Sequence, residues 1–142
     1  MKIKILFTFL TLFVAFISFS QKQVNVEYSD QKVKDLASEV YGEYTEYQTP
    51  ELLKYYKQVL NNTEIIEVSN EEMNAGNYSL ISALILKNKY NQDLDYDKGP
   101  NFDITNFNPL KYFFVNSNAD GSSPYYKIYK TNYLVRYNPN KK

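Results

Sequence analysis

Two segments in the first half of the chain repeat apolar residues with the period of an amphipathic helix. Residues 31–41 place their apolar side chains on one helical face, after Ser29 or Asp30 as a cap and before Gly42. The sequence Thr49-Pro50-Glu51 supplies a capping hydroxyl, a proline at the first helical position and an acidic first turn. The pattern therefore predicts helices over residues 31–41 and 50–60.

After the second helix, the pattern changes to short runs of β-branched and aromatic residues. The run YSLISALIL at 78–86 predicts a strand buried on both faces, although a buried helix has the same apolar character. In the last of these runs, Tyr126 and Ile128 are expected on one face and Tyr125, Lys127 and Tyr129 on the other. Strands are expected over residues 64–68, 78–86, 110–115, 125–129 and 133–137, the last two forming a hairpin.

Helices followed by strands predict an α+β fold. We expect two N-terminal helices packed on one face of a small, mainly antiparallel sheet of about five strands. Residues 69–77 are expected to form a polar loop, and residues 87–108 a longer one of the kind that is usually functional or disordered. Residues 21–142 have the length of a single domain.

The first 20 residues have the organisation of a secretory signal peptide. Lys2 and Lys4 form a basic head, residues 5–17 are apolar, and Ser18 and Ser20 place small residues at positions −3 and −1 of a cleavage site. The alternative is an uncleaved anchor, but the apolar stretch is shorter than the roughly 20 residues that a spanning helix needs. We therefore expect export to the periplasm or the exterior, with membrane contact only through this segment before cleavage after Ser20.

Composition excludes several classes of function. Without Lys2 and Lys4, 14 basic residues face 16 acidic ones, so the basic stripe typical of nucleic-acid binders is not expected. The chain has no cysteine, so its core must hold the fold without disulfides. It also has no histidine, which excludes catalysis by an imidazole base and, together with the absence of cysteine, the common zinc sites. No cofactor is expected.

Two-carboxylate acid/base chemistry or a Ser–Lys pair remains possible without histidine. The candidate carboxylates, however, all lie in polar runs or on polar faces, where surface acids are expected. The candidates are Glu39, Glu43, Glu46, Glu71, Glu72, Asp93, Asp95, Asp97 and Asp103. Asp93, Asp95 and Asp97 have the spacing of a calcium loop, yet Lys98 and Ile104 replace the glycine and glutamate that an EF-hand needs. We expect no catalytic residues and no metal site, and these three aspartates are the one candidate for an irregular calcium site.

Tyrosines dominate the aromatic content, and all 15 lie after residue 20. They either form cross-strand pairs that stabilise the sheet or present an exposed aromatic binding face. A cluster near the helices contains Tyr41, Tyr44 and Tyr47. The candidate binding residues are Tyr125, Tyr126, Tyr129, Tyr133 and Tyr137.

Two segments, LILKNKYN at 84–91 and FNPLKYFF at 107–114, precede the tyrosine-rich hairpin, and the predicted signal peptide ends in Phe19-Ser20 before Gln21. In these features the chain resembles small uncharacterised exported proteins of Bacteroidota, of the flavobacterial type. The resemblance covers residues 50–137. It implies export and brings neither an activity nor site residues with it.

These observations favour a non-enzymatic binding or accessory module of the bacterial cell envelope. It is expected to contact an envelope or secreted protein through the tyrosine-rich sheet face and the loop at 87–108, or by accepting a strand from that partner at a sheet edge. The alternative is a small carboxylate-dependent hydrolase acting on glycans or cell-wall material. Two carboxylates facing each other across a cleft, roughly 5–10 Å apart, are the feature that favours the hydrolase.

Overall fold

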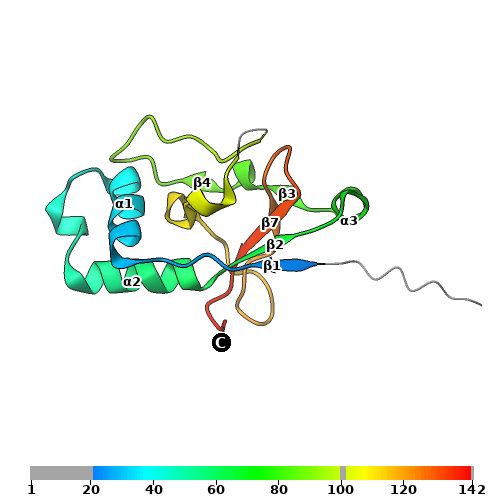
Figure 1. Cartoon of the computed structure of the whole chain (residues 1–142), viewed down its shortest axis with the longest axis horizontal. Coiled ribbons are helices and arrows are strands. Elements are labelled where there is room, and N and C mark those ends of the chain that lie inside the picture. The colour runs from blue at the N-terminus through cyan, green and yellow to red at the C-terminus, as the bar shows by residue number, and fades with distance from the viewer. Residues whose placement is uncertain (1–20, 100–101, 142) are drawn as a thin grey trace, which may run out of the picture.

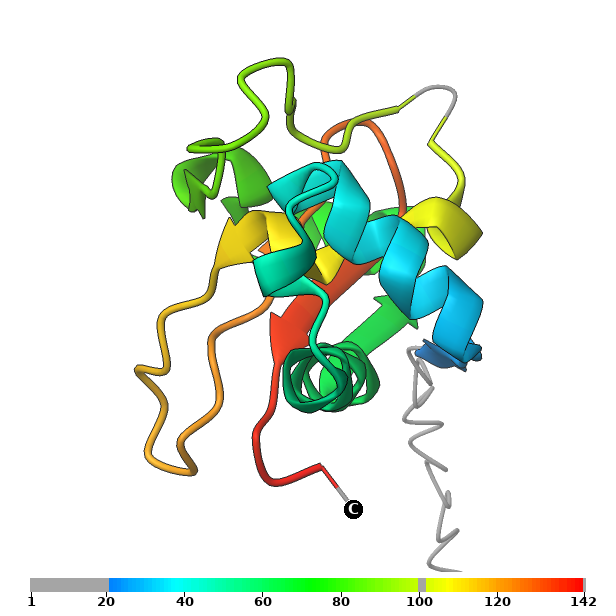
Figure 2. The ribbon, with the colours of Figure 1, turned by 90° about the vertical axis from the view of Figure 1, so that its left-hand side faces the viewer.

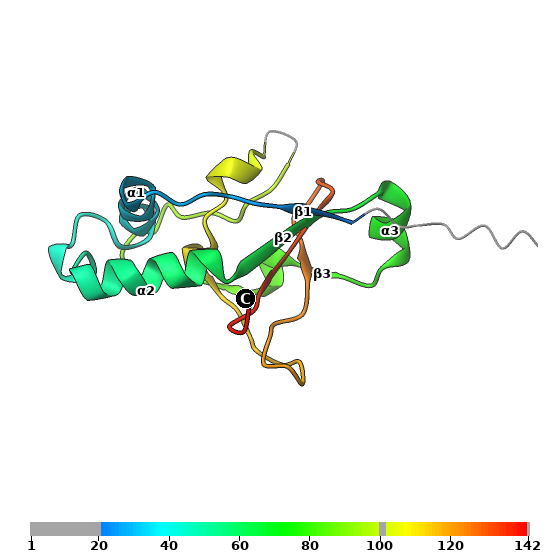
Figure 3. The ribbon, with the colours of Figure 1, turned by 60° about the horizontal axis from the view of Figure 1, so that its bottom comes forward.

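The computed structural model describes residues 21–99 and 102–141, arranged along one axis as a helix pair, a sheet and a third helix (Figure 1). The pair consists of α1, Asp30–Tyr41, and α2, Pro50–Asn61, joined through the 3₁₀ turn η1, Thr45–Tyr47. The third helix, α3, spans Asn70–Ala75 and lies at the opposite end of the molecule (Figure 3). The fold is thus α+β, as the sequence predicts.

The main sheet has five strands in the order β1-β2-β7-β6-β3, and three of its four pairings are antiparallel. Only β3 and β6, at one edge, run parallel. A separate antiparallel ribbon joins β4 to β5. The strands are β1 Lys22–Val24, β2 Thr63–Glu67, β3 Ser79–Leu80, β4 Ile85–Leu86, β5 Tyr112–Phe113, β6 Tyr126–Lys127 and β7 Tyr133–Tyr137.

Both predicted helices form, with the caps that the sequence indicates. The Ser29 hydroxyl accepts a hydrogen bond from the Lys32 amide, and Thr49 does the same for Leu52. The apolar faces of α1 and α2 pack on each other and on Leu110, which lies in the 3₁₀ turn η4, Pro109–Lys111. The pair therefore lies beside one end of the sheet (Figures 1 and 2), which differs from the expected packing over one sheet face.

The apolar run 78–86 forms neither a continuous strand nor a helix. It divides into β3, the 3₁₀ turn η2, Ile81–Ala83, and β4. Ile81 and Leu84 are buried three residues apart, whereas Ile85 is exposed, so the burial follows the three-residue period of a 3₁₀ turn. The expected strand 110–115 is shortened in the same way, because η4 occupies its first two residues.

Helix α3 replaces part of the loop expected over 69–77. The Ser69 hydroxyl accepts a hydrogen bond from the Glu72 amide, which is the Ser-x-x-Glu spacing of a capping box. This signal was present in the sequence, although the helix has only six residues. Glu72 itself is buried, in contrast to the surface position expected for it.

The described part of the 87–108 loop is attached to the body of the protein at several points. The Tyr96 hydroxyl donates to the Leu84 carbonyl at 2.8 Å, and the Gly99 amide donates to the Tyr129 carbonyl at 2.7 Å. A Cβ atom at Gly99 would lie 2.5 Å from the Lys130 carbonyl oxygen, so this close approach requires glycine. Further along, the loop contains the 3₁₀ turn η3, Ile104–Asn106.

Candidate functional site

The structure divides the five candidate binding tyrosines between the two faces of the main sheet. Tyr126 is buried and shares a core cluster with Ile128 and the half-buried Tyr133, as the predicted alternation requires. Tyr125 packs in a different cluster, and Tyr129 is exposed. The five residues therefore do not form one exposed aromatic face.

Tyr125 takes part in a polar network around Glu64 on β2. The Glu64 carboxylate accepts hydrogen bonds from Arg136 Nε at 2.6 Å and the Tyr125 hydroxyl at 3.1 Å, and Asn138 Nδ2 donates at 2.8 Å. Burial raises the pKa of Glu64, but these donors together outweigh it and hold the pKa below its ordinary value. Tyr125 thus ties β2 to the end of the hairpin.

Two of the three aspartates with calcium-loop spacing, Asp95 and Asp97, have different partners. Asp95 pairs with Lys98 at 2.7 Å, while Asp97 turns inward to Lys111 and Tyr112. Within residues 21–99 and 102–141, no group of three acidic, histidine or cysteine side chains is placed to hold a metal ion. The spacing therefore does not bring Asp93, Asp95 and Asp97 together as one set of ligands.

Lys111 is the centre of a buried charge network that the sequence did not reveal. Its ammonium lies 3.3 Å from Asp97 Oδ1 and 3.6 Å from Glu39 Oε1, and its side chain is only 7% exposed. The Tyr112 hydroxyl donates to Asp97 Oδ2 at 2.6 Å and accepts from the Asp97 amide at 2.9 Å. Burial raises the pKa of Asp97 more strongly than these partners lower it.

This network bears on the hydrolase hypothesis because it contains two neighbouring carboxylates, Glu39 and Asp97. A cavity of about 190 Å³ beside Asp97 is also lined by Asp95, Tyr96 and Tyr129. Both oxygens of Asp97 are already bound, however, and the Lys111 ammonium contacts both carboxylates. The arrangement joins α1, the long loop and η4, so its evident role is to fix these three segments together.

Seven aromatic side chains line a groove between α2 and the β4–β5 ribbon. The groove has a volume of about 360 Å³ and continues to the end of β7. We call it the aromatic groove. Its aromatic lining residues are Tyr41, Tyr55, Tyr56, Tyr112, Phe113, Phe114 and Tyr137. Tyr137 is thus the member of the predicted tyrosine set that belongs to it.

One wall of the aromatic groove is a stack of tyrosines. The Tyr41 ring stacks on Tyr56 with ring centres 5.4 Å apart, and on its other neighbour, Tyr47, at 4.9 Å. Tyr56 is buried, whereas Tyr55 beside it is 57% exposed. The predicted cluster around Tyr41 therefore supports the groove and leaves Tyr55 free to contact a ligand.

The opposite wall continues into an exposed apolar surface on the β4–β5 ribbon. Ile85 lies directly opposite Phe113 in the register, so both side chains occupy one face. Ile85 is 69% exposed and Phe113 54%, and Val115, two residues further along the chain, is 59% exposed. Large apolar side chains this exposed, grouped beside a groove, are typical of an interaction surface.

Lys87 places a positive charge in the aromatic groove. Its ammonium lies 4.9 Å from the centre of the Phe113 ring, a cation–π contact. Burial lowers the pKa of Lys87. Among the described residues, no carboxylate forms an ion pair with it. The groove thus combines aromatic walls with a partly desolvated cation that lacks a counter-charge from the described part of the chain.

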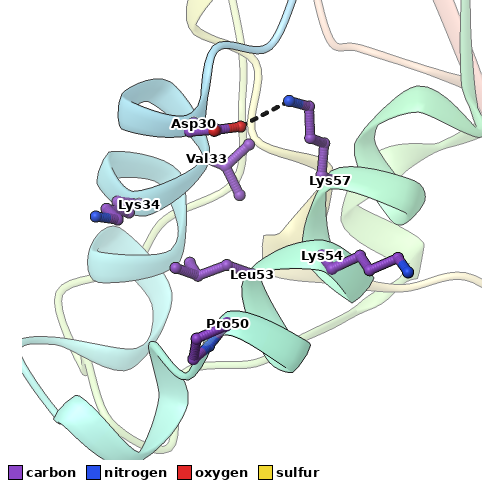
Figure 4. Close-up of a pocket in the computed structure, with 7 residues that line it drawn as sticks. All are labelled: Asp30, Val33, Lys34, Pro50, Leu53, Lys54 and Lys57. Carbon is purple, nitrogen blue, oxygen red and sulfur yellow. Dashed lines mark hydrogen bonds and ion pairs between the residues drawn. The ribbon is translucent and has the colours of Figure 1, made fainter.

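Another cavity, of about 370 Å³, lies between α1 and α2 (Figure 4). Val33, Pro50 and Leu53 form its apolar part, and Asp30 pairs with Lys57 at 2.7 Å across its rim. In Figure 4, Lys34 and Lys54 extend outward in opposite directions. Their charges do not converge, so this cavity has less of the character of a binding site than the aromatic groove.

The groove residues Tyr55, Lys87 and Phe113 were missed at the sequence level. A signal was present, because Ile85 and Lys87 alternate with Leu86, and Phe113 and Val115 alternate with Phe114. That alternation predicts one exposed face, but reading it requires the pairing of 85–86 with 112–113.

Comparison of the chain with protein-family models, with curated proteins and with solved structures gives no match. None of the helices in residues 21–99 and 102–141 has the length and apolar character needed to cross a membrane.

Proposed function

We propose that the protein is a non-enzymatic, exported binding module of the bacterial cell envelope, and that its aromatic groove binds an extended segment of a protein partner. The proposed contact surface is therefore the groove and not the hairpin tyrosines expected from the sequence. Tyr137 belongs to both sets. The signal-peptide pattern of residues 1–20, which lie outside the described residues, supports export.

The observation that carries this proposal is the environment of Lys87. A desolvated ammonium against an aromatic ring gains most from a carboxylate supplied by a ligand. The exposed rings of Tyr55 and Phe113 beside it are suited to apolar side chains. The preferred ligand is therefore a segment that carries an acidic residue next to aromatic or aliphatic ones.

A display library of random peptides, selected on the protein comprising residues 21–142, tests this ligand class. We expect a consensus with an acidic residue adjacent to apolar residues. Calorimetry should show that Lys87→Gln and Phe113→Ser each weaken binding of the selected peptide at least about tenfold, which corresponds to about 1.4 kcal/mol.

Matched controls are available for both substitutions. Lys89 also lies over an aromatic ring, with its ammonium 4.8 Å from the centre of Tyr90, but it is not part of the groove. Tyr129 is 51% exposed and likewise lies outside the groove. Lys89→Gln and Tyr129→Ser should change affinity less than about twofold. Equal losses in the controls and the groove variants, with unchanged unfolding midpoints, would contradict the proposal.

The hydrolase remains the second candidate because Asp97 combines a raised pKa with an adjacent cavity. Incubation with cell-wall fragments and a panel of oligosaccharides, read by mass spectrometry, tests it directly. Hydrolysis that disappears in Asp97→Asn, while the variant stays folded, would favour the enzyme over the binding module.

A further inference from the structure

Glu72, in the first turn of α3, is a buried acid with incomplete hydrogen bonding. Glu72 is only 8% exposed. Oε1 accepts a hydrogen bond from the side-chain amide of Gln21. Oε2 is buried and accepts none from any residue in the described part of the chain. A buried carboxylate oxygen without a donor is costly, so a missing donor close to this oxygen is the expected explanation.

Gln21 is held beside Glu72 by the sheet. The next residue, Lys22, begins β1 and pairs with Glu67 at the end of β2, only two residues before Ser69, which caps α3. The backbone of residue 21 is therefore fixed near α3, in addition to the contact that its side chain makes with Glu72.

Gln21 also directly follows the predicted cleavage site. Hydrolysis of the Ser20–Gln21 peptide bond adds one water molecule, leaves a carboxylate on Ser20 and creates an α-amino group on Gln21. At neutral pH this group is largely protonated, since its ordinary pKa is about 7.7–8.0. Cleavage thus converts a neutral amide with one donor into a cation with three donors at this position.

We propose that the α-ammonium group of Gln21, once released by cleavage after Ser20, pairs with Glu72 Oε2 and completes the bonding of this buried carboxylate. The inference rests on the cleavage step of the proposed export and is independent of the ligand of the aromatic groove. Its consequence is a processing-dependent stability, in which the mature chain is more stable than the same domain with residues still attached before Gln21.

Thermal unfolding of two chain lengths tests the pairing. One chain begins at Gln21, and the other retains Phe19-Ser20, which moves the ammonium away by two residues. We expect the longer chain to unfold about 3–6 °C lower. In Glu72→Gln, the difference between the two chain lengths should fall below about 1 °C, because the charged partner is absent.

Glu71→Gln is the matched control, because Glu71 lies in the same first turn of α3 but is exposed. It should keep the full difference between the two chain lengths. Equal midpoints for the two wild-type chains, or an equal difference in Glu72→Gln, would overturn the pairing.

Mass spectrometry separates failure of the pairing from failure of the processing step. The exported native protein should begin at Gln21, and a different first residue would overturn the proposal at its cleavage step. An N-terminal glutamine can also cyclise, when its α-amine attacks the side-chain amide carbon and expels ammonia. The cyclised chain should unfold no higher than the longer one, because it lacks the ammonium and also loses the side-chain amide that donates to Glu72 Oε1. A cyclised chain as stable as the free amine would also overturn the pairing.

Discussion

Lys87 and Lys111 are neighbours across the β4–β5 ribbon, where the Lys87 amide donates to the Lys111 carbonyl at 2.8 Å, yet their charges have different surroundings. The Lys111 ammonium is buried between two carboxylates, whereas Lys87 faces an aromatic ring and no carboxylate from the described residues. A buried charge that the fold compensates helps to define the structure. A partly buried charge that the fold leaves uncompensated is available to a ligand. We therefore call Lys111 the structural cation and Lys87 the proposed binding cation.

Substitution of Lys111, the structural cation, should cause the largest loss of folding stability. Lys111→Met leaves Asp97 and Glu39 without their counter-charge, and loss of one partner from a buried ion pair typically costs about 3–5 kcal/mol. Urea unfolding at neutral pH measures this loss. Lys98→Met removes an exposed pair with Asp95 and should cost less than about 1 kcal/mol. Similar losses in the two variants would contradict the structural role of Lys111.

Acidification should reduce the loss of unfolding free energy that Lys111→Met causes. Because burial raises the pKa of Asp97, the folded protein binds this proton more readily than the unfolded chain, and the contribution of Asp97 to stability is lost as pH rises through the raised pKa. Without Lys111 the pKa of Asp97 rises further, so protonation relieves the variant more than the wild type. Unfolding free energies measured from about pH 7 to about pH 4 should therefore converge. A constant difference would show that Asp97 is not the group left uncompensated.

Tyr112→Phe should have a smaller effect, of about 1–3 kcal/mol, because it removes a donor from the Asp97 carboxylate and an acceptor from the Asp97 amide. Tyr96→Phe is the comparison, since within the described residues the Tyr96 hydroxyl makes one hydrogen bond, to the Leu84 carbonyl. Denaturant unfolding of both variants measures the difference. A larger loss in Tyr96→Phe would place the main attachment of the loop at Leu84.

Substitution of Lys87, the proposed binding cation, should change the folding stability least. Lys87→Met keeps the apolar stem but removes a desolvated charge, so the free energy of unfolding should stay the same or rise by about 0.5 kcal/mol. Affinity for the selected peptide should nevertheless fall about tenfold. A loss of stability close to that of Lys111→Met would mean that Lys87 is also a structural charge.

The elements predicted well from the sequence are those that local interactions determine. Helices α1 and α2 begin directly after Ser29 and Thr49 because a single hydroxyl caps each, and each helix carries its apolar face over twelve residues. The hairpin of β6 and β7 also follows from local alternation. The division of 78–86 was not predictable, because the short strand at its end depends on the pairing of Ile85 with Phe113, 28 positions further along the chain.

The candidate site was harder to predict, for the same physical reason. Alternation correctly separates Tyr126 from Tyr125, but it does not indicate which of the two faces is covered. The environment of Lys111 depends on Glu39 and Asp97, which come from a helix and a loop distant in sequence. Lys87 and Tyr55 line the same groove because α2 and the ribbon lie on its two sides. Residue type is visible in a sequence, whereas the compensation of a charge depends on contacts between distant segments.

The position of β2 has a consequence for the folding kinetics. This strand pairs with β1 on one side and with β7 on the other, where Thr63 lies opposite Tyr137. The apolar residues Ile65 and Ile66 therefore find their main cross-strand partners in a segment about 70 residues later in the chain. Contacts between such distant residues form slowly, because a long loop must close before they can form. Until β7 is available, β2 has no complete sheet to join, so this strand needs protection from aggregation before the sheet forms.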